Sequence, residues 1–284
     1  MKFSQRIGIS PIKTILQIDS MDNDLKIGLW NSFTYYCLNK AFDRMTYISD
    51  QDDYYKFFIS LWCNFFKLPL DSLKGKVSDL RNFLKDVFMK WKWYEVYDFI
   101  EFIVKEEIPD FPEEFKDDCN RVMKRELSGY RIIENEIVRI TDENEIKEIE
   151  EAIKKSDEYA LKGVENHLRT ALSIMADKKN HNYRNSIKES ISAVESISQI
   201  ITKNPKATLG EALKVLDKHI EIHEALKKGF NSIYGYTSDA GGIRHAMIDD
   251  SDVDFEDAKY MFVACSAFIN YLIIKASKSK ISLK

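Results

Sequence analysis

Apolar residues recur at intervals of three and four along most of this chain, which is the spacing of one face of an α-helix. In the first 128 residues this pattern falls into five short segments, over about residues 22–39, 52–68, 71–87, 91–104 and 113–127. Asp22 and Asp52 stand where helices begin, and Pro69 and Gly129 stand where they end. We therefore expect an N-terminal domain of five short helices.

The pattern changes over residues 130–140. Two β-branched runs, 131–133 and 136–138, flank Glu134 and Asn135 as the strands of a small hairpin would. An isolated hairpin is marginally stable in water, so we expect this one to pack as the joint between two helical domains. Thr141 then opens the next helix.

From residue 142 onward the helical period is stronger. It predicts one long helix over 142–177, a second from Tyr183 to Asn204, and three more that begin at Thr208, His223 and Asp254. The sequence thus predicts an all-α fold of two helical domains joined by a short β-hairpin. Their expected bounds are 1–128 for the N-terminal domain, 129–141 for the joint and 142–284 for a C-terminal bundle of five helices.

Composition limits the class of protein. The chain has 284 residues, enough for two ordinary domains, and 44% of them are hydrophobic, as in a folded globular protein. Ten glycines and five prolines are too few for a typical all-β chain. A net charge of −4 argues against a protein that coats DNA, although 42 Lys and Arg residues leave room for one specific RNA.

Four scattered cysteines, with no Cys-x-x-Cys and no histidine at metal-ligand spacing, indicate free thiols in a reducing cytosol. We expect neither a metal nor a cofactor. The opening MKFSQRIGIS lacks the apolar core of a signal peptide, and the apolar run 261–274 is too short to span a bilayer. The sequence therefore predicts a cytoplasmic protein with no membrane segment.

The most unusual segment is GYTSDAGGIRHA, over residues 235–246. Gly241 and Gly242 permit backbone conformations that other residues reach only at a cost. Arg244 and His245 offer a fixed cation beside a group that titrates near neutral pH. These residues form a candidate catalytic loop between two helices. The alternative is an interhelical turn in which Arg244 neutralises one of the aspartates over 249–252.

Further polar residues are candidates to support this loop or bind phosphate. His181 and Arg184 share one face at the start of a long helix, and Asp239 precedes the two glycines. Glu195 lies in the apolar string AVESI, where a carboxylate needs a cation such as Arg184 or Arg244. A Glu195 on the protein surface is the alternative.

An arginine and a histidine without a metal or an added nucleophile suit the cleavage of RNA. RNA carries its own nucleophile, the 2′-OH, so the enzyme only has to move protons and stabilise the charged phosphorane. The chain has no GxxxxGK[ST], GxGxxG, HExxH or GxSxG motif, which removes support for ATPases, dinucleotide enzymes, zinc hydrolases and serine hydrolases. The aromatic stretch 91–102 has the composition of a base-stacking surface, but we expect it in the core or at an interface.

The opening MKFSQRIGISPIKTILQIDSMDNDLKIGLWN resembles the start of abortive-infection proteins that carry the AbiJ N-terminal domain 4. The segments HNYRNSIKESISAVES, TLGEALKVL and YGYTSDAGGIRHAMIDDSDVDFEDAKYMFVACSAFINYL resemble the C-terminal module that accompanies it, which is similar to HEPN domains. The resemblance covers nearly the whole chain. It implies an anti-phage helical ribonuclease that forms a homodimer, cuts RNA such as tRNA, and responds to a phage-derived trigger or partner protein.

The usual HEPN motif is an arginine and a histidine with four to six residues between them, and this sequence departs from it. Arg184 begins the motif, but Glu189 and Ser190 stand where the histidine is expected, and the arginine before His245 is its immediate neighbour. Arginine and histidine must then converge through folding. Two other functions therefore remain open: a non-catalytic module that senses a nucleotide or phage product, and an interaction or antitoxin-like subunit.

Overall fold

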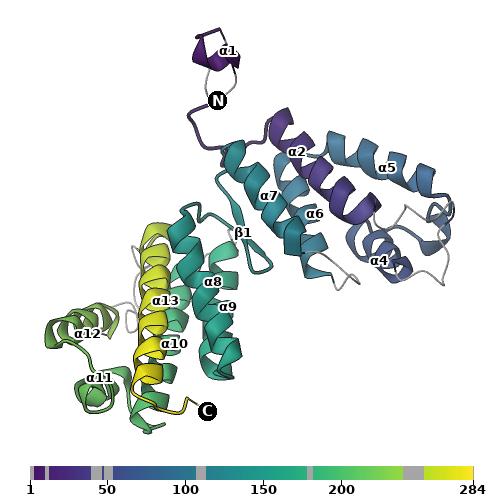
Figure 1. Ribbon diagram of the computed structural model, residues 1–284. Helices are drawn as coiled ribbons and strands as arrows, with labels where there is room; N and C mark the ends of the chain where they lie inside the picture. The colour runs from purple at the N-terminus through teal and green to yellow at the C-terminus, as the bar shows by residue number, and fades with distance from the viewer. Residues whose placement is uncertain are drawn as a thin grey trace. The chain divides into compact units, whose positions relative to one another are not determined.

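The computed structural model describes residues 3–9, 13–39, 47, 54–106, 113–177, 182–238 and 253–283. The chain divides into two compact units, Met1–Thr141 and Asp142–Lys284. Within the described ranges its regular secondary structure is helical except for one two-stranded hairpin (Figure 1). The all-α prediction is therefore confirmed.

The first unit contains the short helices that the sequence predicts. Its helical elements are α1 (Phe3–Arg6), α2 (Asn23–Phe33) with the π-helical η1 (Thr34–Leu38), α4 (Tyr55–Ser60) with the π-helical η2 (Leu61–Phe65), the 3-10 turn η3 (Leu70–Ser72), α5 (Val77–Lys90), α6 (Trp93–Lys105) and α7 (Glu113–Arg125). Asp22 caps α2 by accepting a hydrogen bond from the Leu25 amide. The start expected for the third helix, at residue 71 or 72, is wrong, because Ser72 bonds the Pro69 carbonyl and the Trp62 indole and holds η3 as a separate turn.

Aromatic rings fill the core of this unit. Phe99 of α6 makes contacts with Phe33 of α2, Phe65 of η2 and Trp91, with ring centroids 4.8, 5.5 and 5.2 Å away. Phe99 is only 1% exposed. The aromatic stretch 91–102 therefore supplies core packing through residues such as Phe99, as expected.

The hairpin consists of β1 (Arg131–Ile133) and β2 (Glu136–Val138), paired antiparallel with Ile132 opposite Ile137. Asn120 of α7 exchanges two hydrogen bonds of 2.8 Å with the backbone of Ile132. Glu101 of α6 accepts a hydrogen bond from the Ile137 amide at 2.9 Å. The hairpin thus packs on helices of the first unit, and the division between the units follows it at residue 141.

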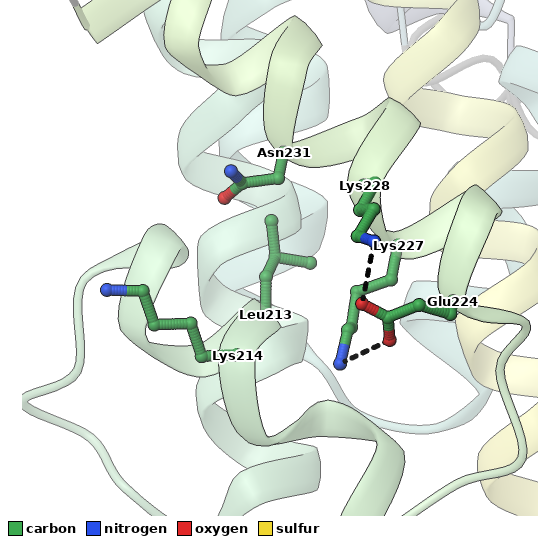
Figure 2. A pocket seen from close by; sticks show the side chains of 6 residues that line it. All are labelled: Leu213, Lys214, Glu224, Lys227, Lys228 and Asn231. Atoms are coloured by element: carbon green, nitrogen blue, oxygen red, sulfur yellow. Dashed lines mark ion pairs between the residues drawn. The ribbon is translucent and has the colours of Figure 1, made fainter.

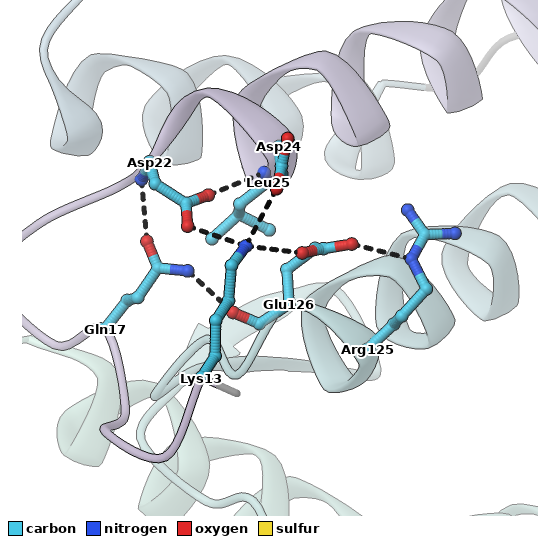
Figure 3. Close-up of polar contacts among 7 residues, drawn as sticks. All are labelled: Lys13, Gln17, Asp22, Asp24, Leu25, Arg125 and Glu126. Carbon is cyan, nitrogen blue, oxygen red and sulfur yellow. Dashed lines mark hydrogen bonds and ion pairs between the residues drawn. The ribbon is translucent and has the colours of Figure 1, made fainter. Parts of the chain in front are cut away.

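The segment before α2 is tied to both ends of this unit through Lys13 (Figure 3). The Lys13 ammonium lies 2.7 Å from Asp22, 3.2 Å from Asp24 and 2.7 Å from Glu126. Gln17 adds a hydrogen bond from its side chain to the Glu126 carbonyl and accepts one from the Asp22 amide, both at 2.6 Å. Lys13 and Gln17 together join the start of α2 to the end of α7, and we call these contacts the N-terminal clamp.

The second unit contains α8 (Glu143–Glu158), α9 (Lys162–Ala176), α10 (Tyr183–Thr202), α11 (Leu209–Val215), the 3-10 turn η4 (Leu216–Lys218), α12 (Glu224–Ser238) and α13 (Phe255–Lys278). Helices α8, α9, α10 and α13 pack in a ring as a four-helix bundle, and α11 and α12 lie beside α10 (Figure 1). The helix that follows the hairpin is capped by Asp142, whose side chain accepts from the Asn144 and Glu145 amides, so it begins one residue later than expected.

The prediction of one long helix over 142–177 is wrong. Ala160 adopts a left-handed backbone conformation with φ 56°, and the Leu161 amide turns back to bond the Ser156 carbonyl at 2.7 Å. This is a Schellman ending, closed by the buried side chain of Leu161. The described part of the second unit therefore has six α-helices, where five were predicted.

Helix α13 forms one wall of the bundle. Within the described ranges it is the one helix long and apolar enough, by length and composition, to cross a membrane. It is longer than the apolar run 261–274 that we considered too short for this. However, 56% of its apolar window is buried inside the protein, and Asn270 donates hydrogen bonds of 2.9 Å to the backbone and side chain of Glu148 on α8. Its place in the bundle core accounts for its composition.

Candidate functional site

The centre of the predicted catalytic loop lies outside the described residues. This applies to Asp239, Gly241, Gly242, Arg244 and His245, and also to His181. Both flanks of the loop are described. Helix α12 continues to Ser238, so the first residues of the segment that we expected to be loop are helical.

The far flank of the loop meets the start of α10. Asp254 caps α13 by accepting hydrogen bonds from the Glu256 and Asp257 amides. The Phe255 ring, in the first turn of α13, contacts the Tyr183 ring edge to face, with centroids 5.9 Å apart. Because Tyr183 is the first residue of α10, the start of α13 lies beside the N-terminus of that helix.

Arg184 is the predicted site residue at this end of α10. It follows Tyr183 directly, and its side chain is half-buried. Asn182 caps the helix by accepting a hydrogen bond from the Asn185 amide at 3.0 Å. Arg184 thus lies in the first turn of α10, where the helix dipole favours an anion.

Glu195 has a partner different from the cation that we expected. Its Oε2 accepts a hydrogen bond of 3.0 Å from the Leu209 amide, the first residue of α11. Thr208 and Glu211 form a capping box at the same helix end. Glu195 and Arg184 are separated by about 16 Å along α10, given a rise of 1.5 Å per residue. The contact of Glu195 in the structure is therefore with α11.

A histidine that sequence reasoning missed lies between α9 and α10. His167 Nδ1 is 2.6 Å from Glu189 Oε2, and the two side chains are 36% and 18% exposed. A carboxylate on one ring nitrogen fixes the orientation of an imidazole and leaves the other nitrogen for a second partner. Glu189 stands where the usual motif has its histidine, five residues after Arg184. Only the packing of two helices brings His167 to it.

A pocket of about 200 Å³ opens between α11 and α12 (Figure 2). Its lining is mostly cationic and polar, with one buried leucine. The residues are Leu213 and Lys214 from α11, and Glu224, Lys227, Lys228 and Asn231 from α12. We call it the lysine pocket.

Ion pairs organise the lysine pocket. Lys227 lies 2.7 Å from Asp217 and 3.1 Å from Glu224, and Lys228 lies 3.7 Å from the same Glu224. The hydrogen bond with Asp217 raises the pKa of Lys227, so its ammonium stays charged. Lys214, from α11, extends on the other side of Leu213 from these two lysines (Figure 2). Lys227 and Lys228 therefore share one carboxylate of the lining, that of Glu224.

The described residues contain no group of three or more His, Cys, Asp or Glu side chains that could hold a metal ion. The cysteines at positions 37, 63, 119 and 265 are free thiols. Burial raises the pKa of both Cys119 and Cys265, which keeps them protonated. These thiols are unsuited to nucleophilic chemistry, because the thiolate is the reactive form.

Comparison with known proteins identifies the N-terminal half. A family model described as AbiJ N-terminal domain 4 matches residues 1–155. The match covers the N-terminal clamp, the aromatic core and the hairpin, and it ends within α8. Searches of the curated proteins and of the solved structures give no match to the chain.

Proposed function

The chain belongs to the AbiJ N-terminal domain 4 family, and on this basis we propose that it is an anti-phage effector of abortive infection that cleaves RNA. The AbiJ domain itself indicates a role in abortive infection and defence. The finer proposal is that the second unit is a HEPN-like domain and carries a metal-independent endoribonuclease site. Its substrate is cellular or phage RNA, with tRNA as one candidate, and a phage-derived trigger or partner protein activates it.

The observation that carries this proposal is the contact between Tyr183 and Phe255. It holds the start of α13 beside the first turn of α10, where Arg184 lies. Arg244 and His245 precede Phe255 by eleven and ten positions in the sequence, and Arg184 directly follows Tyr183. This supports their convergence in one site even though their spacing departs from the usual motif.

In the proposed reaction His245 takes or gives a proton, and Arg244 binds the phosphate oxygens with its two-pronged guanidinium. Arg184 adds a second cation at the N-terminus of α10, where the helix dipole favours the negative phosphorane. Gly241 and Gly242 let the loop backbone approach the RNA closely. The 2′-OH of the RNA attacks the adjacent phosphate, and the 5′ oxygen leaves with a proton.

A cleavage assay with the purified full-length protein and total tRNA, with and without EDTA, tests this proposal. We expect cleavage that EDTA leaves unchanged and that Arg244→Lys reduces strongly, because an ammonium cannot reproduce the bidentate contact. Products with a 2′,3′-cyclic phosphate would identify the 2′-OH as the nucleophile. Cleavage that EDTA abolishes would contradict the mechanism.

The second candidate function is a non-catalytic module that senses a nucleotide or a phage product. The pairing of Glu189 with His167 favours it, because the residue at the usual histidine position is a carboxylate held by another helix. In this case the same purified protein binds RNA or nucleotide and leaves tRNA intact.

We further propose that the protein acts in the cytoplasm as a homodimer. Two-fold pairing is the commonest assembly of soluble proteins, and a shared site would bring a second copy of Arg184 and His245 to one RNA. No membrane segment is needed for this role, since α13 serves as a wall of the bundle.

A further inference from the structure

We propose that the lysine pocket is a phosphate-binding site, separate from the catalytic loop, that holds a phosphate group of RNA or of a free nucleotide. The first argument is charge. Lys214, Lys227 and Lys228 supply three cations to the lining, and two carboxylates, Asp217 and Glu224, pair with Lys227 and Lys228. One net positive charge is left, which a bound phosphate would neutralise.

The second argument is that Lys227 is already positioned. Its side chain is only 13% exposed, and Asp217 holds the ammonium at 2.7 Å from outside the pocket lining. Glu224 is 57% exposed and contacts both Lys227 and Lys228. An incoming phosphate can therefore replace Glu224 as the shared partner of the two lysines, while Asp217 keeps Lys227 in place.

The third argument is the rigidity of α12. Phe230 stacks on Phe268 of the bundle helix α13, with ring centroids 3.7 Å apart. Tyr234 packs so closely on α11 that a Cβ atom at Gly210 would lie 3.3 Å from its ring. These contacts fix the gap between α11 and α12, so a ligand enters a preformed pocket and loses less affinity to ordering the protein.

Size and position indicate how a ligand would bind. A volume of about 200 Å³ is below the usual range for pockets that enclose a whole ligand. It suffices for a phosphate with part of its sugar, while the rest of the ligand stays outside. Lys228 is about 15 Å along α12 from Ser238, at 1.5 Å per residue, and the catalytic loop follows Ser238.

Phosphate binding at the lysine pocket does not depend on RNA cleavage, so it can be tested whether or not the protein cleaves RNA. The test measures binding of a labelled 2′-O-methyl oligoribonucleotide, which has no 2′-OH to attack, to the full-length protein by fluorescence anisotropy over a salt series. The variant is Lys214→Gln with Lys228→Gln, two exposed residues of the pocket. The matched control is Lys147→Gln with Lys154→Gln on α8, which removes the same charge away from the pocket.

We expect the pocket variant to bind about tenfold more weakly than the control variant, and its salt slope to fall by about 0.7 for one lost phosphate contact on a single strand. Glu224→Gln is expected to tighten binding, because it removes the competing carboxylate. If AMP or inorganic phosphate displaces the labelled oligoribonucleotide from these lysines, the site binds free nucleotides. If neither displaces it, the site binds an RNA strand. Equal affinity and slope in both double variants, or weaker binding by Glu224→Gln, would overturn the proposal.

Discussion

At the scale of single residues, the tightest constraint in the first unit is at Gly28. A Cβ atom at this position in α2 would lie 2.5 Å from the Val122 side chain of α7. Val122 is β-branched and 5% exposed, so it has little room to move. In contrast, a Cβ at Gly229 in α12 would meet nothing within 4 Å. Close packing against α7 therefore requires a glycine at position 28, whereas no packing contact requires one at position 229.

Gly28→Ala is expected to destabilise the first unit by about 1–3 kcal/mol, the usual cost of overpacking a core. Gly229→Ala is its control and should stabilise α12 by up to about 1 kcal/mol, because alanine is the better helix former. Urea unfolding followed by circular dichroism measures both. A neutral Gly28→Ala would show that α2 and α7 are packed less closely than the structure has them.

The N-terminal clamp predicts a dependence on pH. Burial alone would raise the pKa of Asp22 and Glu126, but hydrogen bonds and charge from Lys13 outweigh it and hold both pKa values below their usual range. A carboxylate with a lowered pKa stabilises the fold above its unfolded pKa of about 4. This contribution is lost as the pH falls through the folded pKa.

We therefore expect the free energy of unfolding of the first unit to decrease below about pH 4, and Lys13→Met to flatten this decrease. Tryptophan fluorescence isolates the first unit, since all four tryptophans, Trp30, Trp62, Trp91 and Trp93, belong to it. Lys85→Met, which removes an exposed lysine of α5 outside the clamp, is the control. An equal effect of both variants would rule out a specific role for Lys13.

At the scale of helices, capping residues explain what could be predicted from the sequence. Each of three capping residues, Asp22, Thr208 and Asp254, accepts a hydrogen bond from a backbone amide in the first turn of the helix that follows. These helix starts could therefore be predicted from a few neighbouring residues in the sequence. The helix break at Ala160 could not be predicted from the sequence. A left-handed residue at a helix end is usually glycine, and here it is alanine.

The candidate site was predicted only in part for a related reason. The catalytic loop and Arg184 could be proposed as site residues from the local sequence alone. The pair His167–Glu189 joins residues of two helices, and the lysine pocket depends on how α11 packs against α12. Such contacts are set by tertiary packing, which a local pattern does not encode. The partner of Glu195 is a third example, since it is a backbone amide of α11.

Glu195→Ala tests whether this carboxylate acts through α11. We expect a loss of about 1 kcal/mol in stability, the usual cost of removing a helix cap, measured by urea unfolding with circular dichroism. Thr208→Ala removes the other cap at the same helix end and should cost a similar amount. If Glu195→Ala leaves stability unchanged and abolishes RNA cleavage, Glu195 binds substrate and our structural interpretation is wrong.

At the scale of the whole molecule, the chain combines an AbiJ N-terminal unit with a helical bundle, to which we assign the proposed chemistry. A homodimer is the assembly that we propose for it. Light scattering of the purified protein at tens of micromolar should give about twice the mass of the 33.2 kDa chain. A stable monomer that still cleaves RNA would show that one copy holds a complete site.

The central claim is that His245 performs RNA cleavage, and its most direct test compares His245→Ala with the unmodified protein. The measurement is the rate of tRNA cleavage, paired with the thermal unfolding midpoint of the same samples. We predict that His245→Ala loses at least about 100-fold in rate, the usual contribution of a general acid or base, with the midpoint nearly unchanged. A fully active His245→Ala, or one that unfolds, would contradict the claim.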